Sequence, residues 1–268
     1  MSWFDHRKLI RVEMANATAN GLPTINGIYV DNARIARAGG DWWPPVVIKA
    51  DEGDDAPRDY TGGNHLKGGV RTARLLDWQL NRGGGDCSSF SVSWTVELMA
   101  YNTVGKRRPI AQQQFVARFY PGVIETVYGI TLSEPASVLW ENGPQMTTDG
   151  FRESLHFIGG APQPGTPFID DVRNSGPRRQ FKTDRIAVVT GTNAVQASWV
   201  DPKFDAGDGR YVDPRSAFMR SAQRTGKVYQ AIVTTPIHFN AGQGYQWRGG
   251  YAWGIHESDV IALIRKRM

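Results

Sequence analysis

The chain has 268 residues, of which 40% are hydrophobic and 21% charged. This composition excludes a mainly disordered, collagen-like or coiled-coil chain. The formal net charge is +5, which permits contact with nucleic acid, phosphate or acidic surfaces, but no helix-turn-helix, zinc-finger or RNA-binding motif accompanies it. We therefore favour a solvated basic surface over a nucleic-acid site.

Glycine and proline breaks divide the first half of the chain into short segments. We predict short helices over residues 1–20 and 32–38 and a strand over residues 27–30. A further helix is predicted over residues 70–80, where apolar side chains recur at helical spacing: Val70, Ala73, Leu76 and Leu80.

Period-two alternation predicts strands in the middle of the chain. Apolar residues alternate with serines from Phe90 to Trp94, so a strand is predicted over residues 88–99. Two more strands are predicted over residues 112–118 and 123–132. A Tyr-Pro-Gly break separates them, which indicates antiparallel pairing.

The second half is predicted to continue the same mixture of elements. Residues 159–176 are rich in proline and glycine and are expected to form a loop, and residues 258–266 a short helix or strand. The remaining predicted elements are strands over residues 138–140, 186–190, 194–200 and 227–235, and helices over residues 147–156 and 216–225.

These elements predict an α+β, strand-dominated fold of split antiparallel sheets with short helices. No low-complexity linker divides the chain. We predict a soft boundary that separates an N-terminal β-rich region (residues 1–134) from a second region (residues 135–268), with one continuous domain as the alternative.

The single cysteine, Cys87, excludes an intrachain disulfide and a cysteine-based zinc site. We interpret it as a small residue at a strand edge, with a catalytic thiol as the alternative. The N-terminus lacks the apolar stretch of a Sec signal peptide, and the longest apolar runs are far shorter than a membrane span. We therefore expect a soluble protein, either cytoplasmic or delivered by a non-Sec route.

Sequence motifs for metal, phosphate and hydrolytic sites are missing. The five histidines form no pair at metal-ligand spacing, so we expect no metal site. Asp201, Asp205 and Asp208 lack the final glutamate of a calcium loop and are interpreted as a solvated turn. Glu134 and Glu141 lie on an apolar background; burial would point to function, but we expect both to be exposed.

Segments of the second half resemble mono-ADP-ribosyltransferases of the cholera and pertussis toxin type. Residues 227–236 and 246–255 resemble the closing strands of that family, and residues 188–192 lie where it has a Ser-Thr-Ser strand. Residues 138–141 and 149–151 resemble its first strand and the following Gly-Phe. The resemblance covers roughly residues 135–265.

The resemblance implies NAD as cofactor and a dinucleotide cleft lined by Thr190, Thr192, Gln246, Arg248 and Trp253. In this alignment Trp253 would stack on a ring of NAD. The key identities of the family are replaced, because Glu141 falls near its NAD-binding arginine and Arg248 near its catalytic glutamate. That exchange reverses the charges the chemistry needs, so the catalytic residues stay unknown and a degenerate, toxin-type effector is predicted.

The first half resembles the same family more faintly. Residues 28–34, 89–95 and 114–121 resemble its opening segment, its Ser-Thr-Ser strand and a closing strand. Either the first half completes one enlarged domain, or two degenerate copies follow each other.

Two other interpretations remain open. A β-rich structural component of a virion or secretion apparatus would use aromatic residues as anchors in contacts with a protein partner or larger assembly. A sugar-binding module would use the same residues as stacking platforms. Plain core packing is the alternative to both for this aromatic set: Trp42, Trp43, Trp247, Tyr251 and Trp253.

Overall fold

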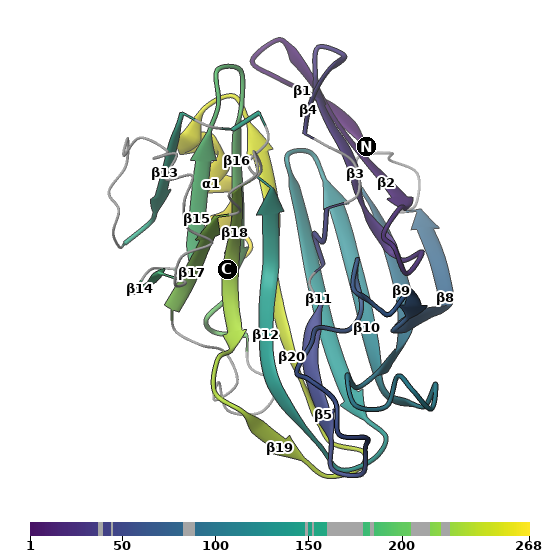
Figure 1. The fold of residues 1–268 in the computed structure, drawn as a ribbon. Helices are drawn as coiled ribbons and strands as arrows, with labels where there is room; N and C mark the ends of the chain where they lie inside the picture. The colour runs from purple at the N-terminus through teal and green to yellow at the C-terminus, as the bar shows by residue number, and fades with distance from the viewer. Residues whose placement is uncertain are drawn as a thin grey trace.

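Two antiparallel sheets lie face to face and form a β-sandwich, with a smaller sheet beside them (Figure 1). The structure is a computed structural model that describes residues 1–36, 40–43, 45–82, 89–147, 150–151, 153–159, 179–182, 185–204, 215–220 and 226–268.

The larger layer is an eight-stranded sheet in the order β13-β15-β16-β20-β11-β10-β9-β8. Strands β9 and β10 alternate buried and more exposed residues, because one face packs against the core, whereas β13, β15 and β16 are buried almost throughout. The strands are β8 (Ala73–Arg82), β9 (Phe90–Met99), β10 (Pro109–Tyr120), β11 (Val123–Leu132), β13 (Ser154–Phe157), β15 (Ile186–Thr190), β16 (Val195–Val200) and β20 (Gly244–Gly254).

The facing layer is a six-stranded assembly built around β12. The order is β14-β17-β18-β12-β19, and β5 also pairs with β12. The strands are β5 (Val46–Ala50), β12 (Ala136–Thr147), β14 (Arg179–Lys182), β17 (Arg215–Arg220), β18 (Gly226–Val233) and β19 (Ile237–Phe239). A separate short hairpin joins β6 (Leu66–Lys67) to β7 (Val70–Arg71).

The N-terminal strands form a four-stranded antiparallel sheet beside the six-stranded layer (Figure 1). Its side chains Val12 and Met14 share a groove with Val92 and Phe119 of the eight-stranded sheet. The strands are β1 (Ser2–Asp5), β2 (Lys8–Asn16), β3 (Pro23–Val30) and β4 (Ala33–Ala36).

The helix α1 (Glu257–Arg265) covers the outer face of the eight-stranded sheet near its C-terminal strands. Its buried residues Val260 and Ile264 pack with Trp199 and Ala252. No helix in the described part of the chain is long and apolar enough to cross a membrane.

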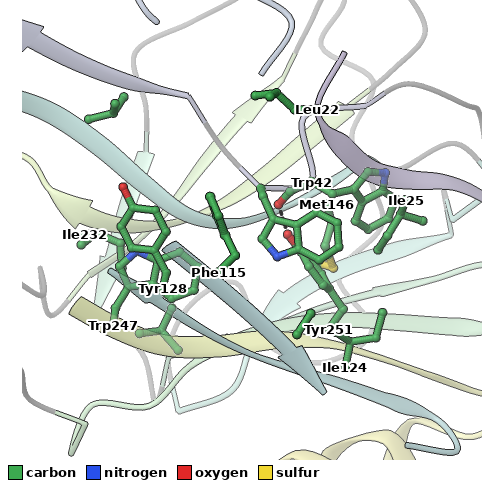
Figure 2. Close-up of a cluster of buried hydrophobic side chains, with 14 of the residues drawn as sticks. Leu22, Ile25, Trp42, Phe115, Ile124, Tyr128, Met146, Ile232, Trp247 and Tyr251 are labelled. Carbon is green, nitrogen blue, oxygen red and sulfur yellow. Dashed lines mark hydrogen bonds between the residues drawn. The ribbon is translucent and has the colours of Figure 1, made fainter. Parts of the chain in front are cut away.

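The main core lies between the two large sheets and is rich in aromatic rings. Figure 2 shows Trp42, Phe115, Tyr128, Trp247 and Tyr251 together in this layer. Tyr128 stacks on Trp247 with ring centroids 5.0 Å apart. Such rings remove large apolar areas from water, which stabilises the sandwich.

The prediction of a strand-dominated fold with antiparallel sheets is confirmed, but of the several short helices predicted the described residues contain one, α1. The strand predicted over residues 123–132 coincides with β11, and that over residues 186–190 with β15. The predicted ADP-ribosyltransferase architecture is wrong, as the structural comparisons below show. Strands from both halves of the sequence share the eight-stranded sheet.

Four predicted helices are wrong. Residues 1–20 form the β1–β2 hairpin, whose turn residues His6 and Arg7 have φ of 45° and 68°. Two successive left-handed residues are typical of a tight hairpin turn, but glycine or asparagine is usual there. Residues 32–38 contain β4, residues 216–225 contain the end of β17, and residues 147–156 contain the end of β12 and the start of β13.

The helix predicted over residues 70–80 is also wrong, and a β-bulge explains why. Strand β8 pairs with β9, and its register shifts between Leu75 and Asp77. The extra residue, Leu76, breaks the period of two and places apolar residues at spacings that imitate a helix. The predicted loop at residues 159–176 and Cys87 lie outside the described residues.

Candidate functional site

Glu141 is a carboxyl group enclosed in the protein core. Glu141 on β12 points inward and is fully buried between the sheets. Tyr245 donates a hydrogen bond to one of its oxygens, and the Trp247 indole N–H donates to the other at 3.3 Å. Burial raises the pKa of Glu141 to about 7, and the hydrogen bonds from Tyr245 and Trp247 oppose this shift. The expectation that Glu141 is exposed is therefore wrong.

The outer face of the six-stranded layer holds a second group of polar residues, which are buried apart from the partly exposed Lys227. Directly paired residues on neighbouring strands point to the same face. Gln145 pairs with Tyr229 and Thr147 with Lys227, whereas Met146 lies in the core. The outer face therefore presents amide, hydroxyl, phenol and ammonium groups side by side.

An open cavity of about 530 Å³ lies on the outer side of β5 and β12. It is lined by Val47, Arg58, Asp59, Tyr60 and Trp140. Trp140 donates its indole N–H to the Asn142 side-chain oxygen at 3.0 Å, which orients the ring. Two aromatic rings beside an arginine and an aspartate offer flat apolar surface and hydrogen-bonding groups together.

His65 and Asp41 are not among the residues that line this cavity, but His65 adjoins it through Tyr60. The Tyr60 and His65 ring centroids are 5.1 Å apart. On its other side His65 Nε2 lies 3.7 Å from Asp41 Oδ2. The His65 side chain is 35% exposed and that of Asp41 only 4%, so His65 is the member that solvent or a ligand reaches.

The surrounding backbone holds the pair in place. The other Asp41 oxygen, Oδ1, accepts the Asn64 N–H at 2.6 Å. A Cβ at Gly63, whose φ is +50°, would lie 2.4 Å from the same oxygen, so glycine is required there. The buried Asn20 amide donates to the carbonyls of Gly63 and His65.

Burial shifts the two pKa values toward each other. It raises the pKa of Asp41, and the positive charges of Lys227 and His65 oppose that rise. It lowers the pKa of His65, while Asp41 opposes that fall and Lys227 adds to it. The two shifts bring the proton affinities of Asp41 and His65 closer together, so a proton can pass between them, as a general acid–base group requires.

Of the five predicted dinucleotide residues, one lies at the end of β15, one in the turn that precedes β16 and three along β20. Thr190 ends β15, where its hydroxyl lies 2.7 Å from that of Ser154, and Thr192 is exposed in the following turn. This turn leads to Val195, which pairs with Gly254. Gln246 is eight positions from Gly254 on the same strand, about 26 Å at the usual rise per residue.

Arg248 and Trp253 occupy opposite faces of β20. Arg248 forms an ion pair with the buried Asp201 on the outer face. Trp253 is buried in the inner core, where its indole N–H donates to Gln196 Oε1 at 2.9 Å. Asp205 and Asp208 lie outside the described residues.

Core packing is confirmed for the aromatic residues that sequence analysis left open. The five side chains are at most 6% exposed: Trp42, Trp43, Trp247, Tyr251 and Trp253. Neither an assembly anchor nor a sugar platform is available from these rings. Sequence reasoning missed Asp41, Tyr60, His65 and Trp140, because each is an isolated residue that the fold alone brings beside the others.

No family model and no curated protein matches this sequence. The fold is similar to that of solved carbohydrate enzymes. A galactose mutarotase related enzyme from Lactobacillus acidophilus matches with a TM-score of 0.50 and 9% identity over 96% of this chain and 99% of that chain.

Two larger enzymes contain a similar fold. The GH36 α-galactosidase AgaA from Geobacillus stearothermophilus matches with a TM-score of 0.50 and 9% identity. The galactosidase domain of the α-galactosidase–sucrose kinase AgaSK matches with a TM-score of 0.50 and 8% identity. This chain is covered to 96% and 95%, but it spans only 40% of either chain's length.

These likenesses correct the family expectation drawn from the sequence. The chain has a β-sandwich similar to that of a galactose mutarotase related enzyme, and the resemblance to ADP-ribosyltransferases is wrong. The toxin-type effector interpretation falls with it, and so does the alternative of a virion or secretion component. The assignment of NAD rested on that resemblance alone.

Proposed function

We propose that this protein binds a sugar in the cavity between Tyr60 and Trp140 and that His65 transfers protons on the bound sugar. The observation that carries the proposal is the juxtaposition of an aromatic-lined cavity with an acid–base pair that shares one wall, Tyr60. The fold similarity to a galactose mutarotase related enzyme supports a carbohydrate ligand by analogy.

The chemistry of the cavity suits a sugar ring. One face of a pyranose is apolar and stacks on aromatic rings, which Tyr60 and Trp140 supply. Hydroxyl groups need both donors and acceptors, which the Arg58 guanidinium and the Asp59 carboxylate supply. The volume of about 530 Å³ lies in the range of small-molecule sites.

The reaction we propose is the interconversion of the two anomers of an aldose. A base removes the proton of the anomeric hydroxyl while an acid protonates the ring oxygen, which opens the ring to the aldehyde. Closure on the other face of the carbonyl reverses both transfers. The reaction needs general acid–base groups and no oxidant or reductant. His65 would exchange the proton, and Asp41 would hold and polarise it from behind.

The test measures binding and turnover separately. Binding of D-galactose and D-glucose is followed by NMR line broadening and calorimetry, and anomer interconversion by polarimetry of freshly dissolved α-D-galactose. We expect saturable binding and a rate above the buffer-catalysed reaction. Binding without rate enhancement would retain the sugar site and remove the catalytic role. Absence of binding for both sugars would contradict the proposal.

A further inference from the structure

The turn of the first hairpin meets the beginning of the C-terminal helix. Asp5 and His6 lie at the end of β1 and in the turn before β2, and Asp259 lies in the first turn of α1. Residues from the two ends of the sequence are therefore neighbours, although no spacing in the sequence relates them. This location is distinct from the proposed sugar cavity, which lies on β5 and β12.

Three side chains converge at this point with metal-ligand chemistry. The ligand atoms of Asp5, His6 and Asp259 all lie within 4.8 Å of one another. His6 Nε2 is 2.8 Å from Asp259 Oδ2 and 3.8 Å from Asp5 Oδ1. The His256 ring packs edge-on against His6, with centroids 4.3 Å apart, and fixes the orientation of the imidazole.

The backbone at His6 adopts an unfavourable conformation in this arrangement. His6 has a φ of 45°, a left-handed conformation that is uncommon for residues other than glycine. The second Asp5 oxygen accepts the Ile255 N–H at 2.7 Å, which fastens the turn to the segment before α1. Contacts on both sides therefore direct His6 at Asp259, although glycine or asparagine would adopt the left-handed backbone of this turn more easily.

We propose that Asp5, His6 and Asp259 form a binding site for a divalent transition-metal ion, with Zn²⁺ as the best match. An imidazole with two carboxylates is a borderline ligand set that suits zinc, whereas calcium and magnesium prefer oxygen ligands only. Three protein ligands leave one tetrahedral position for water. The ion would join the N-terminal hairpin to the C-terminal helix.

The test titrates chelator-treated protein with zinc chloride by calorimetry, in a Cys87→Ser background that removes the thiol. We expect one site at which His6→Asn and Asp259→Asn each weaken affinity at least tenfold. Asparagine at position 6 tolerates the left-handed backbone and keeps the turn. Far-UV circular dichroism and a cooperative unfolding transition check that each variant is folded.

The chain offers a matched control in His238 and Asp51. Their Nε2–Oδ2 distance is 2.9 Å and their exposures are 50% and 49%, against 2.8 Å, 49% and 50% for His6 and Asp259, but the pair belongs to no three-residue cluster among the described residues. His238→Asn should bind zinc like the parent. Cobalt substitution should give a visible spectrum that His6→Asn abolishes.

Three results would overturn the proposal. The first is zinc affinity that is unchanged in both His6→Asn and Asp259→Asn. The second is an equal loss in His238→Asn, because zinc would then bind any exposed His–Asp pair. Parent protein that shows no saturable binding below 1 mM zinc also contradicts it, since a site of that affinity would not hold the ion.

Discussion

Glu141 and Asp41 are carboxyl groups whose pKa values burial raises, yet only Asp41 lies beside a side chain that solvent reaches, His65. Glu141 is enclosed by the Tyr245 and Trp247 donors in the core between the sheets. Asp41 lies behind His65, which is 35% exposed. A raised pKa therefore identifies a buried carboxyl group, whereas a functional role also requires that a ligand can reach the group or its partner.

Removal of the enclosed carboxyl should have the largest effect on stability. Glu141→Ala leaves the Tyr245 hydroxyl and the Trp247 N–H without their acceptor and opens a cavity in the core. We expect a loss of about 4 kcal/mol in the free energy of unfolding, measured by urea denaturation. Asp41→Asn, in contrast, should lower the free energy of unfolding by less than half of that amount. Equal losses in the two variants would show that the two carboxyl groups do not differ in their structural role.

Removal of the accessible histidine should act on rate instead of stability. His65→Gln keeps a polar side chain but not a titratable one. We expect polarimetric anomer interconversion to fall about 100-fold, with the urea midpoint nearly unchanged. His238→Gln, at an exposed His–Asp pair elsewhere, is the control and should retain full activity. A His65 variant with normal turnover would show that the pair is structural only.

The pH dependence of stability should separate the same two regions. Because the pKa of Glu141 is about 7 in the fold and 4.5 in the reference state, the native protein binds a proton that the unfolded chain has released between these values. Stability from this group therefore falls as pH rises from about 4.5 to 7, by on the order of 3 kcal/mol.

Glu141→Gln keeps the hydrogen-bonding shape and removes the titration. The variant should show a flatter stability profile over that range and should gain stability relative to the parent at pH 8. Urea denaturation at a series of pH values checks this, with His65→Gln as the comparison. A parallel profile in Glu141→Gln and the parent would mean that Glu141 does not titrate in this window.

Much of the fold was predictable from the sequence, and the failures have physical causes. Alternation identified β9 because one face of that strand is buried, whereas β15 is a short apolar run that is buried on both faces. The bulge at Leu76 and the left-handed turn at His6 defeated the same reasoning, since neither carries its usual sequence signal. The candidate site was not predictable. Trp140 shares a cavity with Tyr60 only through the pairing of β5 with β12, and the path of the loop that follows β5 alone brings His65 against Tyr60 and Asp41.

The aromatic wall of the cavity should contribute a smaller effect than the acid–base pair. Trp140→Ala removes one stacking surface but leaves Tyr60 and His65 in place. We expect sugar affinity to fall about tenfold, roughly 1.4 kcal/mol, while the catalytic constant at saturating sugar changes less. Trp78, which is 49% exposed on the edge strand β8, gives the matched control, and Trp78→Ala should bind sugar normally.

A partly exposed carboxylate with an exposed partner should complete the series with the smallest effect. Glu97 accepts two hydrogen bonds from Arg74, at 2.7 and 3.1 Å, but the Arg74 side chain is 72% exposed. Solvent screens such a pair, so Glu97→Gln should change the free energy of unfolding by less than about 0.5 kcal/mol. A double-mutant cycle with Arg74→Gln measures the coupling directly. A coupling energy as large as the stability loss of Glu141→Ala would show that burial does not rank the three carboxylates. The difference between Glu141 and Asp41 would then rest only on the groups that donate hydrogen bonds to them.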